Sequence, residues 1–240
     1  MTTATDEVRR GSAYVLGAYL LWGLFPLYFA ALTPAGALEI LAHRILWSLV
    51  VVGLVLAVRG RHGWIRAVRR DRAVAAQLVA AALLIAVNWL VYVWAVASDR
   101  VVDAALGYFV NPLVTVALGV VVLGERLRRL QWIAVALGAA SVVVIVLGYG
   151  RVPWVSFVLA FSFAGYGFLK RRIPLRALES LAAETVVLAP VAAGLLVLVA
   201  APRIQARDNL ALWHGVGTFL YVAQWLCALI AVIRLQQRRT

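Results

Sequence analysis

The sequence has few of the side chains that usually carry chemistry. It contains one cysteine, Cys227, inside an apolar block, and three histidines, at positions 43, 62 and 214, without ligand spacing. A single cysteine excludes a disulfide framework and a thiolate metal site. Motifs for nucleotide binding (G-x-x-x-x-G-K-[ST]) and zinc hydrolysis (H-E-x-x-H) do not occur, and no Ser/His/Asp set stands out. We therefore expect no enzyme, no cofactor and no resident metal.

Charged residues are scarce as well, at 14% of the 240 residues, whereas 65% are hydrophobic and the mean hydropathy is +0.94. A soluble domain of this composition could not cover its surface with polar groups. The apolar residues form long blocks close to the roughly 20 residues that a helix needs to cross about 30 Å of hydrocarbon. A spanning helix also satisfies its own backbone hydrogen bonds. The sequence therefore predicts an all-α, polytopic membrane helix bundle.

Short turn-forming or charged segments separate the apolar blocks, so we expect about eight transmembrane helices. The first block follows a polar segment, Met1 to Arg10, that carries no A-x-A-like cleavage site, and we interpret it as a retained span. The segment at residues 59–72 is expected to be a basic loop. The predicted spans lie at residues 12–32, 38–58, 73–97, 101–123, 130–148, 153–169, 177–200 and 210–233.

Lysine and arginine outnumber the acidic residues, 23 to 10, and the net charge is +13. These cations lie between the apolar blocks and not on one soluble face, which argues against a nucleic-acid partner. Segments that alternate along the chain hold 18 of the 23, and this bias predicts that they and both termini are cytoplasmic. Anionic lipid of the inner leaflet would reinforce this orientation. We expect a multi-pass protein of the plasma (inner) membrane, surrounded by membrane lipid.

A weak internal repeat links the two halves of the chain. Residues 38–44 (LEILAHR) and 178–184 (LESLAAE) agree at four of seven positions, and nearly the same offset brings Trp22-Gly23 onto Tyr166-Gly167. A unit of five spans that begins again at span six would place the two copies in opposite orientations, as in many secondary transporters. We therefore predict an inverted five-helix repeat, with a first copy at residues 1–148 and an incomplete second copy at residues 149–240.

Ionisable side chains within spans are costly in lipid, which makes them candidates for function. Glu39 and His43 are four residues apart on one face of span two, and Arg44 lies beside them. This group could bind a substrate or carry a proton, or Arg44 could snorkel or close a structural ion pair. Both alternatives stay open. The repeat makes Glu184 the counterpart of Arg44, and we hypothesise that the two face one another.

Spans three and four add further polar and small residues. Asn88 and Tyr92 share a face of span three, where ordinary packing competes with clasping of a solute. Span four carries a row of polar or small residues at intervals of four, which forms either a packing face or the lining of a pathway. We favour packing for its glycines, leave both interpretations open for Asn111, place Asp103 at the outer interface and expect a kink at Pro112. The row comprises Asp103, Gly107, Asn111, Thr115 and Gly119.

Five segments carry a resemblance to a known family: 42–48 (AHRILWS), 88–96 (NWLVYVWAV), 106–113 (LGYFVNPL), 123–132 (LGERLRRLQW) and 159–167 (LAFSFAGYG). Together they resemble the RarD branch of the EamA-type transporters, in the drug/metabolite transporter superfamily. The resemblance runs from about residue 11 to about residue 200. It implies an inner-membrane carrier built from two five-helix repeats. After about residue 200 the sequence departs from that pattern, because the last expected spans and a second G-E motif are not recognisable.

These observations and the resemblance favour a secondary transporter that moves a small organic solute, a drug or a metabolite, by alternating access. An ion gradient is the expected driving force, with Arg44 setting the charge preference and Glu184 or His43 carrying a proton. The alternatives are a transport-defective truncated paralogue, or a membrane scaffold that needs a partner; a homo-oligomer stays open. A lipid-modifying enzyme is disfavoured because the acids and histidines are scattered. The candidate residues for the substrate or ion pathway are Glu39, His43, Arg44, Asn88, Tyr92, Asn111 and Glu184.

The charge bias makes a direct prediction about orientation. Alkaline phosphatase fused after Arg66 should be inactive and green fluorescent protein fused there should fluoresce, because residues 59–72 carry six arginines. The opposite result is expected after Asp99, in a segment with one arginine. Active phosphatase after Arg66 would reverse the orientation.

Overall fold

The computed structural model describes residues 4–32, 36–150 and 152–205, and every regular element within these ranges is an α-helix. This confirms the predicted all-α fold class. The predicted eighth span, residues 210–233, lies outside the described residues. The helices are α1 (Ala4–Gly23), α2 (Phe25–Ala31), α3 (Ala37–Val58), α4 (Gly63–Arg70), α5 (Arg72–Ala97), α6 (Val101–Leu123), α7 (Arg129–Tyr149), α8 (Trp154–Lys170) and α9 (Ala177–Gln205).

Within the described residues, five helices are long and apolar enough to cross a membrane: α3, α5, α6, α7 and α9. Helix α8 is apolar but shorter, with 17 residues. These six helices correspond to the predicted spans two to seven. The chain is therefore a polytopic membrane protein, as the hydropathy predicts.

The first predicted span is two helices and not one. Helix α1 begins at Ala4, inside the polar segment, and the helical structure is interrupted at Leu24 before α2 begins. The second residue of α2 is Pro26, which has no backbone N–H to donate to the preceding turn. The interruption thus follows from a proline that the prediction of a span at 12–32 did not take into account.

The basic segment at residues 59–72 also differs from the expected loop, because it contains the short helix α4. Trp64 and Val68 of α4 pack against core side chains, whereas Arg66 faces outward. Asp71 then ends α4 and begins α5, since its carboxylate accepts hydrogen bonds from the backbone N–H groups of Ala73 (2.8 Å) and Val74 (3.2 Å). Such an N-cap satisfies donors that the first helical turn leaves without partners.

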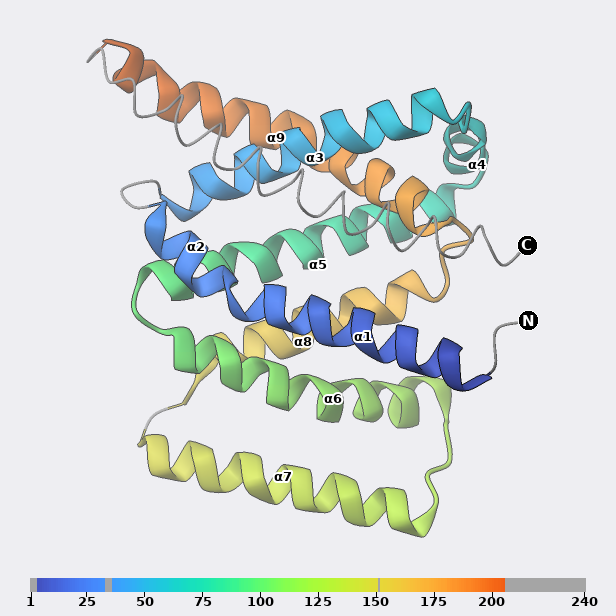
Figure 1. Ribbon diagram of the computed structural model, residues 1–240, viewed down its shortest axis with the longest axis vertical. Helices are drawn as coiled ribbons and strands as arrows, with labels where there is room; N and C mark the ends of the chain where they lie inside the picture. The colour runs from blue at the N-terminus through green and yellow to red at the C-terminus, as the bar shows by residue number, and fades with distance from the viewer. Residues whose placement is uncertain (1–3, 33–35, 151, 206–240) are drawn as a thin grey trace.

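The membrane-crossing helices follow one another along the long axis of the molecule in the order α9, α3, α5, α8, α6 and α7 (Figure 1). Helix α3 packs mainly against α9, and α6 packs mainly against α8, while α5 contacts both α8 and α9. Helices α3 and α9 run in opposite directions, whereas α6 and α8 run in the same direction. Helix α5 is therefore the central layer between two groups of helices.

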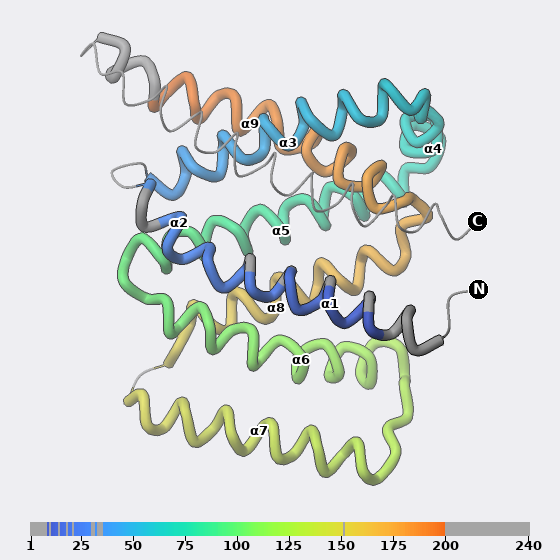
Figure 2. Tube along the Cα trace, in the orientation of Figure 1, coloured from blue at the N-terminus to red at the C-terminus, as the bar shows by residue number. Residues whose placement is uncertain are grey.

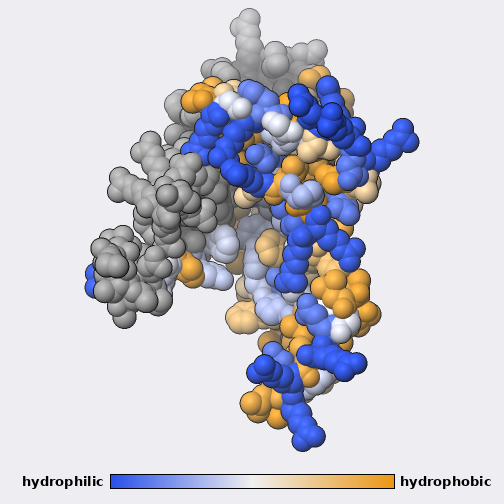
Figure 3. Space-filling model, turned by 90° about the vertical axis from the view of Figure 1, so that its right-hand side faces the viewer, coloured by the Kyte–Doolittle hydropathy of each residue, from blue (hydrophilic) through white to orange (hydrophobic). Residues whose placement is uncertain are grey.

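Three of the basic connections lie at one end of the bundle. The trace in Figure 2 brings α4, the turn after α6 and the turn after α8 to the same end of the molecule, and the turn after α5 to the opposite end. Seen from that first end, in Figure 3, hydrophilic residues gather along the described part of the surface. The arginine-rich segments thus share one end of the bundle, as expected if they lie on one side of the membrane.

Polar contacts between α5, α6 and α8 hold the centre of the bundle. The side-chain amide of Asn88 donates to the carbonyl oxygen of Leu159 and to the hydroxyl of Ser162, both at 2.9 Å. The hydroxyl of Ser156 donates to the backbone carbonyl of Asp103. Asp103 lies in the first turn of α6 and is buried among its neighbours, with 2% of its surface exposed.

Gly107 allows α6 and α8 to approach closely. A Cβ atom at this position would lie 3.0 Å from Cβ of Leu159 and 3.1 Å from the backbone oxygen of Ser156. This supports packing as the role of Gly107, in line with the small-residue contacts common between membrane helices. Helix α7, by contrast, has no buried residue and contacts the bundle through α6.

Alanine substitutions at two glycines should separate the steric effect of a methyl group against α8 from the intrinsic effect of alanine on a helix. Gly107→Ala is expected to lower the free energy of unfolding by about 1–3 kcal/mol, because the added methyl group meets α8. Gly53→Ala is the matched control, since a Cβ on Gly53 of α3 has nothing within 4 Å. Unfolding in detergent–SDS mixtures measures both. Equal stabilities for the two variants would contradict the close contact.

Candidate functional site

Besides the contacts of Asn88 and Ser156, polar groups within the described helices gather in three further places, and the first is the face of α3 toward α5. Glu39 is buried, with 4% of its surface exposed, and His43 and Arg44 are half-buried. The guanidinium carbon of Arg44 lies 3.6 Å from the centre of the Trp89 ring on α5. A cation over an indole face in a desolvated site is a stabilising contact. The indole thus supports Arg44 within the bundle.

Tyr92 lies among aromatic rings. Its ring packs edge-to-face against Phe29 of α2 and Tyr108 of α6, with centroid distances of 6.1 and 6.2 Å. Aromatic pairs at such distances contribute beyond the area they bury. Tyr92 therefore links α2, α5 and α6.

The second place is a hydrogen-bonded network between α8 and α9. Lys170 is the last residue of α8, and its ammonium group lies 2.7 Å from Oε1 of Glu184. Ser180 accepts a hydrogen bond from Lys170 and donates to the same Oε1 at 2.9 Å. Tyr166 donates from its hydroxyl to Oε2 of Glu184 at 3.2 Å. Both carboxylate oxygens of a nearly fully buried acid are thus satisfied.

The network requires the Lys170 side chain to extend from the end of α8 to the level of Glu184 in α9. Glu184 is about 10 Å along α9 from its first residue, given a rise of about 1.5 Å per residue. Lys170 extends from the end of α8 to this depth, and 24% of its side chain stays exposed. Burial of a charge in lipid is costly unless it is paired. The geometry therefore allows an ionised Glu184 inside the bundle.

Glu184 is paired with Lys170, and the predicted Arg44–Glu184 pair is wrong. The physical reason is the register of α3 on α9. Leu41 and Ile45, on either side of Arg44, pack in one cluster with Leu188 and beyond, one turn or more past Glu184. The weak repeat identified two related positions, but the antiparallel packing of the helices places them at different levels.

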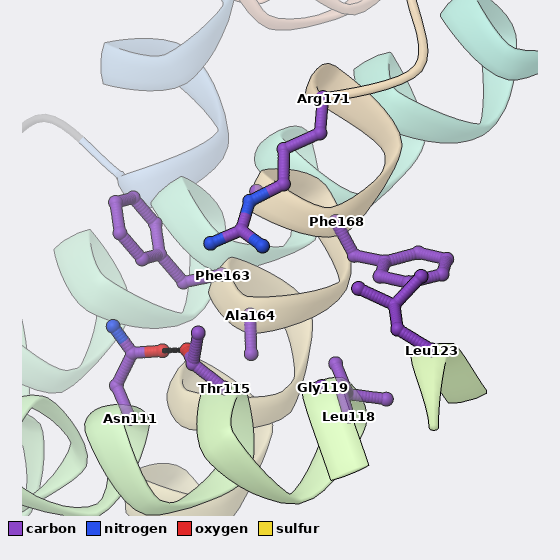
Figure 4. Close-up of a pocket in the computed structure, with 10 residues that line it drawn as sticks. Asn111, Thr115, Leu118, Gly119, Leu123, Phe163, Ala164, Phe168 and Arg171 are labelled. Atoms are coloured by element: carbon purple, nitrogen blue, oxygen red, sulfur yellow. Dashed lines mark hydrogen bonds between the residues drawn. The ribbon is translucent and has the colours of Figure 1, made fainter. Parts of the chain in front are cut away.

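The third place is a cavity of about 200 Å³ between α6 and α8 (Figure 4). Its lining is mostly apolar, with one amide, one hydroxyl and one guanidinium group. The Thr115 hydroxyl donates to the Asn111 side-chain oxygen at 3.4 Å. The lining residues are Asn111, Thr115, Leu118, Gly119, Leu123, Phe163, Ala164, Gly167, Phe168 and Arg171.

The row of residues spaced by four on α6 serves two purposes. Each step of four advances by about 40° beyond a full turn, so the row winds around the helix. Its first part, Asp103 and Gly107, packs on α8, whereas Asn111, Thr115 and Gly119 line the cavity. Packing and lining, which were alternatives for the row, each apply to one part of it.

The seven predicted pathway residues do not form one site. Asn111 is the one among them that lines this cavity, and Glu39, His43 and Arg44 lie together on α3. The predictions missed the cations that complete the other two places, Lys170 and Arg171. A signal was present, because Tyr166/Lys170 and Ser180/Glu184 are each spaced by four, which places their members on one helix face. Among the described residues, no three His, Cys, Asp or Glu side chains could hold a metal ion.

Comparisons with known proteins bear on this arrangement. The model of the EamA-like transporter family matches residues 9–147. Protein RarD of Streptomyces exfoliatus is 51% identical over 220 residues, which cover 92% of this chain and 69% of that protein. Uncharacterized transporter YojE of Bacillus subtilis is 42% identical over 194 residues, covering 79% and 65%. Protein RarD of Escherichia coli is 38% identical over 187 residues, covering 78% and 63%.

The matches also show how much of this chain and of its relatives is similar. The chain spans about two thirds of the length of these curated relatives. The match to the Streptomyces protein covers more of the chain than residues 1–200 contain, so similarity continues beyond residue 200. The matches to the Bacillus and Escherichia coli proteins cover less of the chain, 79% and 78%.

The Lys170–Glu184 pair can be tested by a double-mutant cycle. Lys170→Met should lower the free energy of unfolding by about 3 kcal/mol, because it leaves a buried carboxylate without its cation. The double variant Lys170→Met/Glu184→Gln should be more stable than the sum of the two single effects implies, since both charges are gone. Unfolding in detergent–SDS mixtures measures the cycle, and additive effects would contradict coupling between the two side chains.

Proposed function

Because the chain belongs to the EamA-like transporter family, we propose that it is a secondary transporter that moves a small organic solute across the plasma membrane by alternating access. The proposal makes the protein a membrane transporter and not an enzyme. Its two halves, residues 1–148 and 149–240, would act as inverted repeats with both termini in the cytoplasm. The curated relatives are longer than this chain. That this chain shares the activity of the complete relatives is therefore part of the proposal.

The observation that carries the proposal is the double role of α8. Phe163, Gly167 and Arg171, spaced by four, line the cavity toward α6. Tyr166 and Lys170, on another side of the same helix, bind Glu184 of α9. A solute in the cavity and the charge state of Glu184 would therefore act on one rigid element. Differential interaction with two positions of such an element is what coupled transport requires.

A protonation step gives a direct route to coupling. With Glu184 ionised, Lys170 ties α8 to α9 at the arginine-rich end of the bundle. A proton on Glu184 would remove the charge that attracts Lys170 and weaken this tie. Helix α8 would then be freer to move relative to α5 and α9. We accordingly propose Glu184 as the proton carrier, with His43 as the other candidate of the pathway.

The remaining predicted residues take different roles in this proposal. Glu39 and Arg44, on the α3 face, would set the charge preference of the route between α3 and α5. Tyr92 would contribute an aromatic wall, and Asn111 would contact the solute from α6. Asn88 is better explained as a structural contact, because its amide group is committed to Leu159 and Ser162 on α8.

Reconstituted transport tests the proposal. The full chain in proteoliposomes should move at least one member of a panel of organic anions, cations and neutral solutes, faster with an imposed pH gradient than without it. Glu184→Gln should remove most of the acceleration by the gradient, since the amide cannot take up the proton. Arg44→Ala should lower flux or alter charge preference.

Arg66→Ala is the matched control, because it removes an exposed positive charge of α4 outside the proposed pathway. It should transport as the unaltered chain does. Unchanged flux in both Arg44→Ala and Glu184→Gln would refute the residue roles. No gradient-driven flux for any member of the panel would favour a scaffold or a transport-defective paralogue.

A further inference from the structure

Arg171 is the one charged side chain in the lining of the cavity between α6 and α8. An arginine at the end of a membrane helix normally extends toward the interface. Figure 4 shows its guanidinium group folded back over the cavity, on the side where Asn111, Thr115 and Phe163 lie. Within the described part of the chain, no acidic side chain forms an ion pair with Arg171. This cation therefore faces a space that a ligand could occupy.

We propose that this cavity binds a small organic anion, with its acidic group at Arg171 and its apolar or aromatic body between α6 and α8. The inference rests on the proposed transport function and names the class of solute that this site would take. Guanidinium is suited to it, because its planar set of N–H donors matches both oxygens of a carboxylate.

The size of the cavity limits the body of the ligand. Its volume of about 200 Å³ is below the range of roughly 300–1,000 Å³ that is typical for drug-sized ligands. Phe163 and Phe168 supply phenyl surfaces on α8, and Leu118 and Leu123 supply aliphatic surface on α6. A compound with a single ring and one acidic group fits this combination of size and lining.

The polar atoms of the lining also favour an anion. The Asn111 carbonyl oxygen already accepts a hydrogen bond from Thr115, which leaves the N–H donors of the Asn111 amide for a ligand. Glu125 places its carboxylate against Gly119, but it is not among the lining residues. Donors and a positive charge thus dominate the interior of the cavity.

The neighbouring cations also favour a negatively charged ligand. Lys170 is neutralised by Glu184, whereas Arg172 stacks on the ring of Phe168 at 4.4 Å and adds positive potential beside the cavity. The site lies toward the arginine-rich end of the bundle, where an anion stays close to the interface and loses less hydration than at the centre of the membrane. Fields of one sign around a recess also raise the local concentration of the opposite ion.

Binding of 4-fluorobenzoate to the full chain in phosphatidylcholine nanodiscs tests the proposal, with fluorine NMR as the readout. The probes 4-fluorobenzyl alcohol and 4-fluorobenzylamine have the same ring with a neutral or cationic group. We expect 4-fluorobenzoate to bind most tightly. Arg171→Ala should weaken its binding about ten- to hundredfold, the range for loss of one charge-assisted hydrogen-bonding group.

Three further variants make the result specific. Arg171→Lys should retain part of the affinity, because it keeps the charge and loses the planar fork. Phe163→Ala should weaken all three probes, and Arg66→Ala on α4 should change none of them. Equal binding of the anion and the amine, or equal binding of the anion to the unaltered chain and to Arg171→Ala, would overturn the proposal.

Anionic lipid could supply the same chemistry, so a second arm adds phosphatidylglycerol to the nanodiscs. Failure of 4-fluorobenzoate to bind in phosphatidylcholine, together with Arg171-dependent binding of phosphatidylglycerol, would overturn the solute and assign the cavity to lipid. The proposed function fails separately. Arg171-dependent binding of 4-fluorobenzoate without flux of any solute in proteoliposomes would refute transport and leave the anion site standing.

Discussion

A carboxylate inside a membrane-spanning bundle must find its partners within the protein, because the hydrocarbon offers no water to replace them. Glu184 meets this requirement with three side chains, two of them on another helix. Desolvation of the acid is offset only while Lys170 and Tyr166 of α8 stay at the level of Glu184 in α9. The positions of the two helices at this end of the bundle therefore depend on one another through a single charged group.

The contacts of α5 and α6 with α8 connect the rest of the bundle to this pair of helices. Helix α5 contacts both α8 and α9, and Asn88 fixes α5 to α8 through two hydrogen bonds near the middle of α8. Ser156 and Gly107 hold the first part of α8 against α6. The later part of α8 diverges from α6 in Figure 1, and the cavity beside Asn111 and Thr115 lies between these parts of the two helices. The first half of α8 is thus closely packed on both neighbours, while the other half carries the ion pair and the cavity.

Three successive cations at and just after the end of α8 have different partners. Lys170 reaches Glu184, Arg171 turns toward the cavity, and Arg172 lies over Phe168. A run of basic residues that would ordinarily mark the cytoplasmic side of a span thus also supplies the counter-charge of a buried acid and a cation in the lining of the cavity. Orientation in the membrane, stability of the bundle and selectivity for a solute would then depend on the same three residues.

The sequence by itself determined the class of this protein. Length and hydropathy of the apolar blocks predicted the spans that correspond to α3, α5, α6, α7, α8 and α9, because spanning lipid requires a continuous apolar helix of nearly fixed length. Local motifs from residue 88 to residue 132 indicated the family, and the costs of charge in lipid singled out Glu39, Arg44 and Glu184 as unusual.

Tertiary structure decided which of these unusual groups meet. The repeat related Glu184 to Arg44, but the antiparallel register of α3 on α9 separated them and Lys170 became the partner. On α6, Gly107 packs closely on α8, whereas Asn111 lies beside the cavity where the two helices diverge. Composition and periodicity report the environment of each residue along its own helix. Contacts between helices depend on their register and rotation, which are set by the packing of many side chains together.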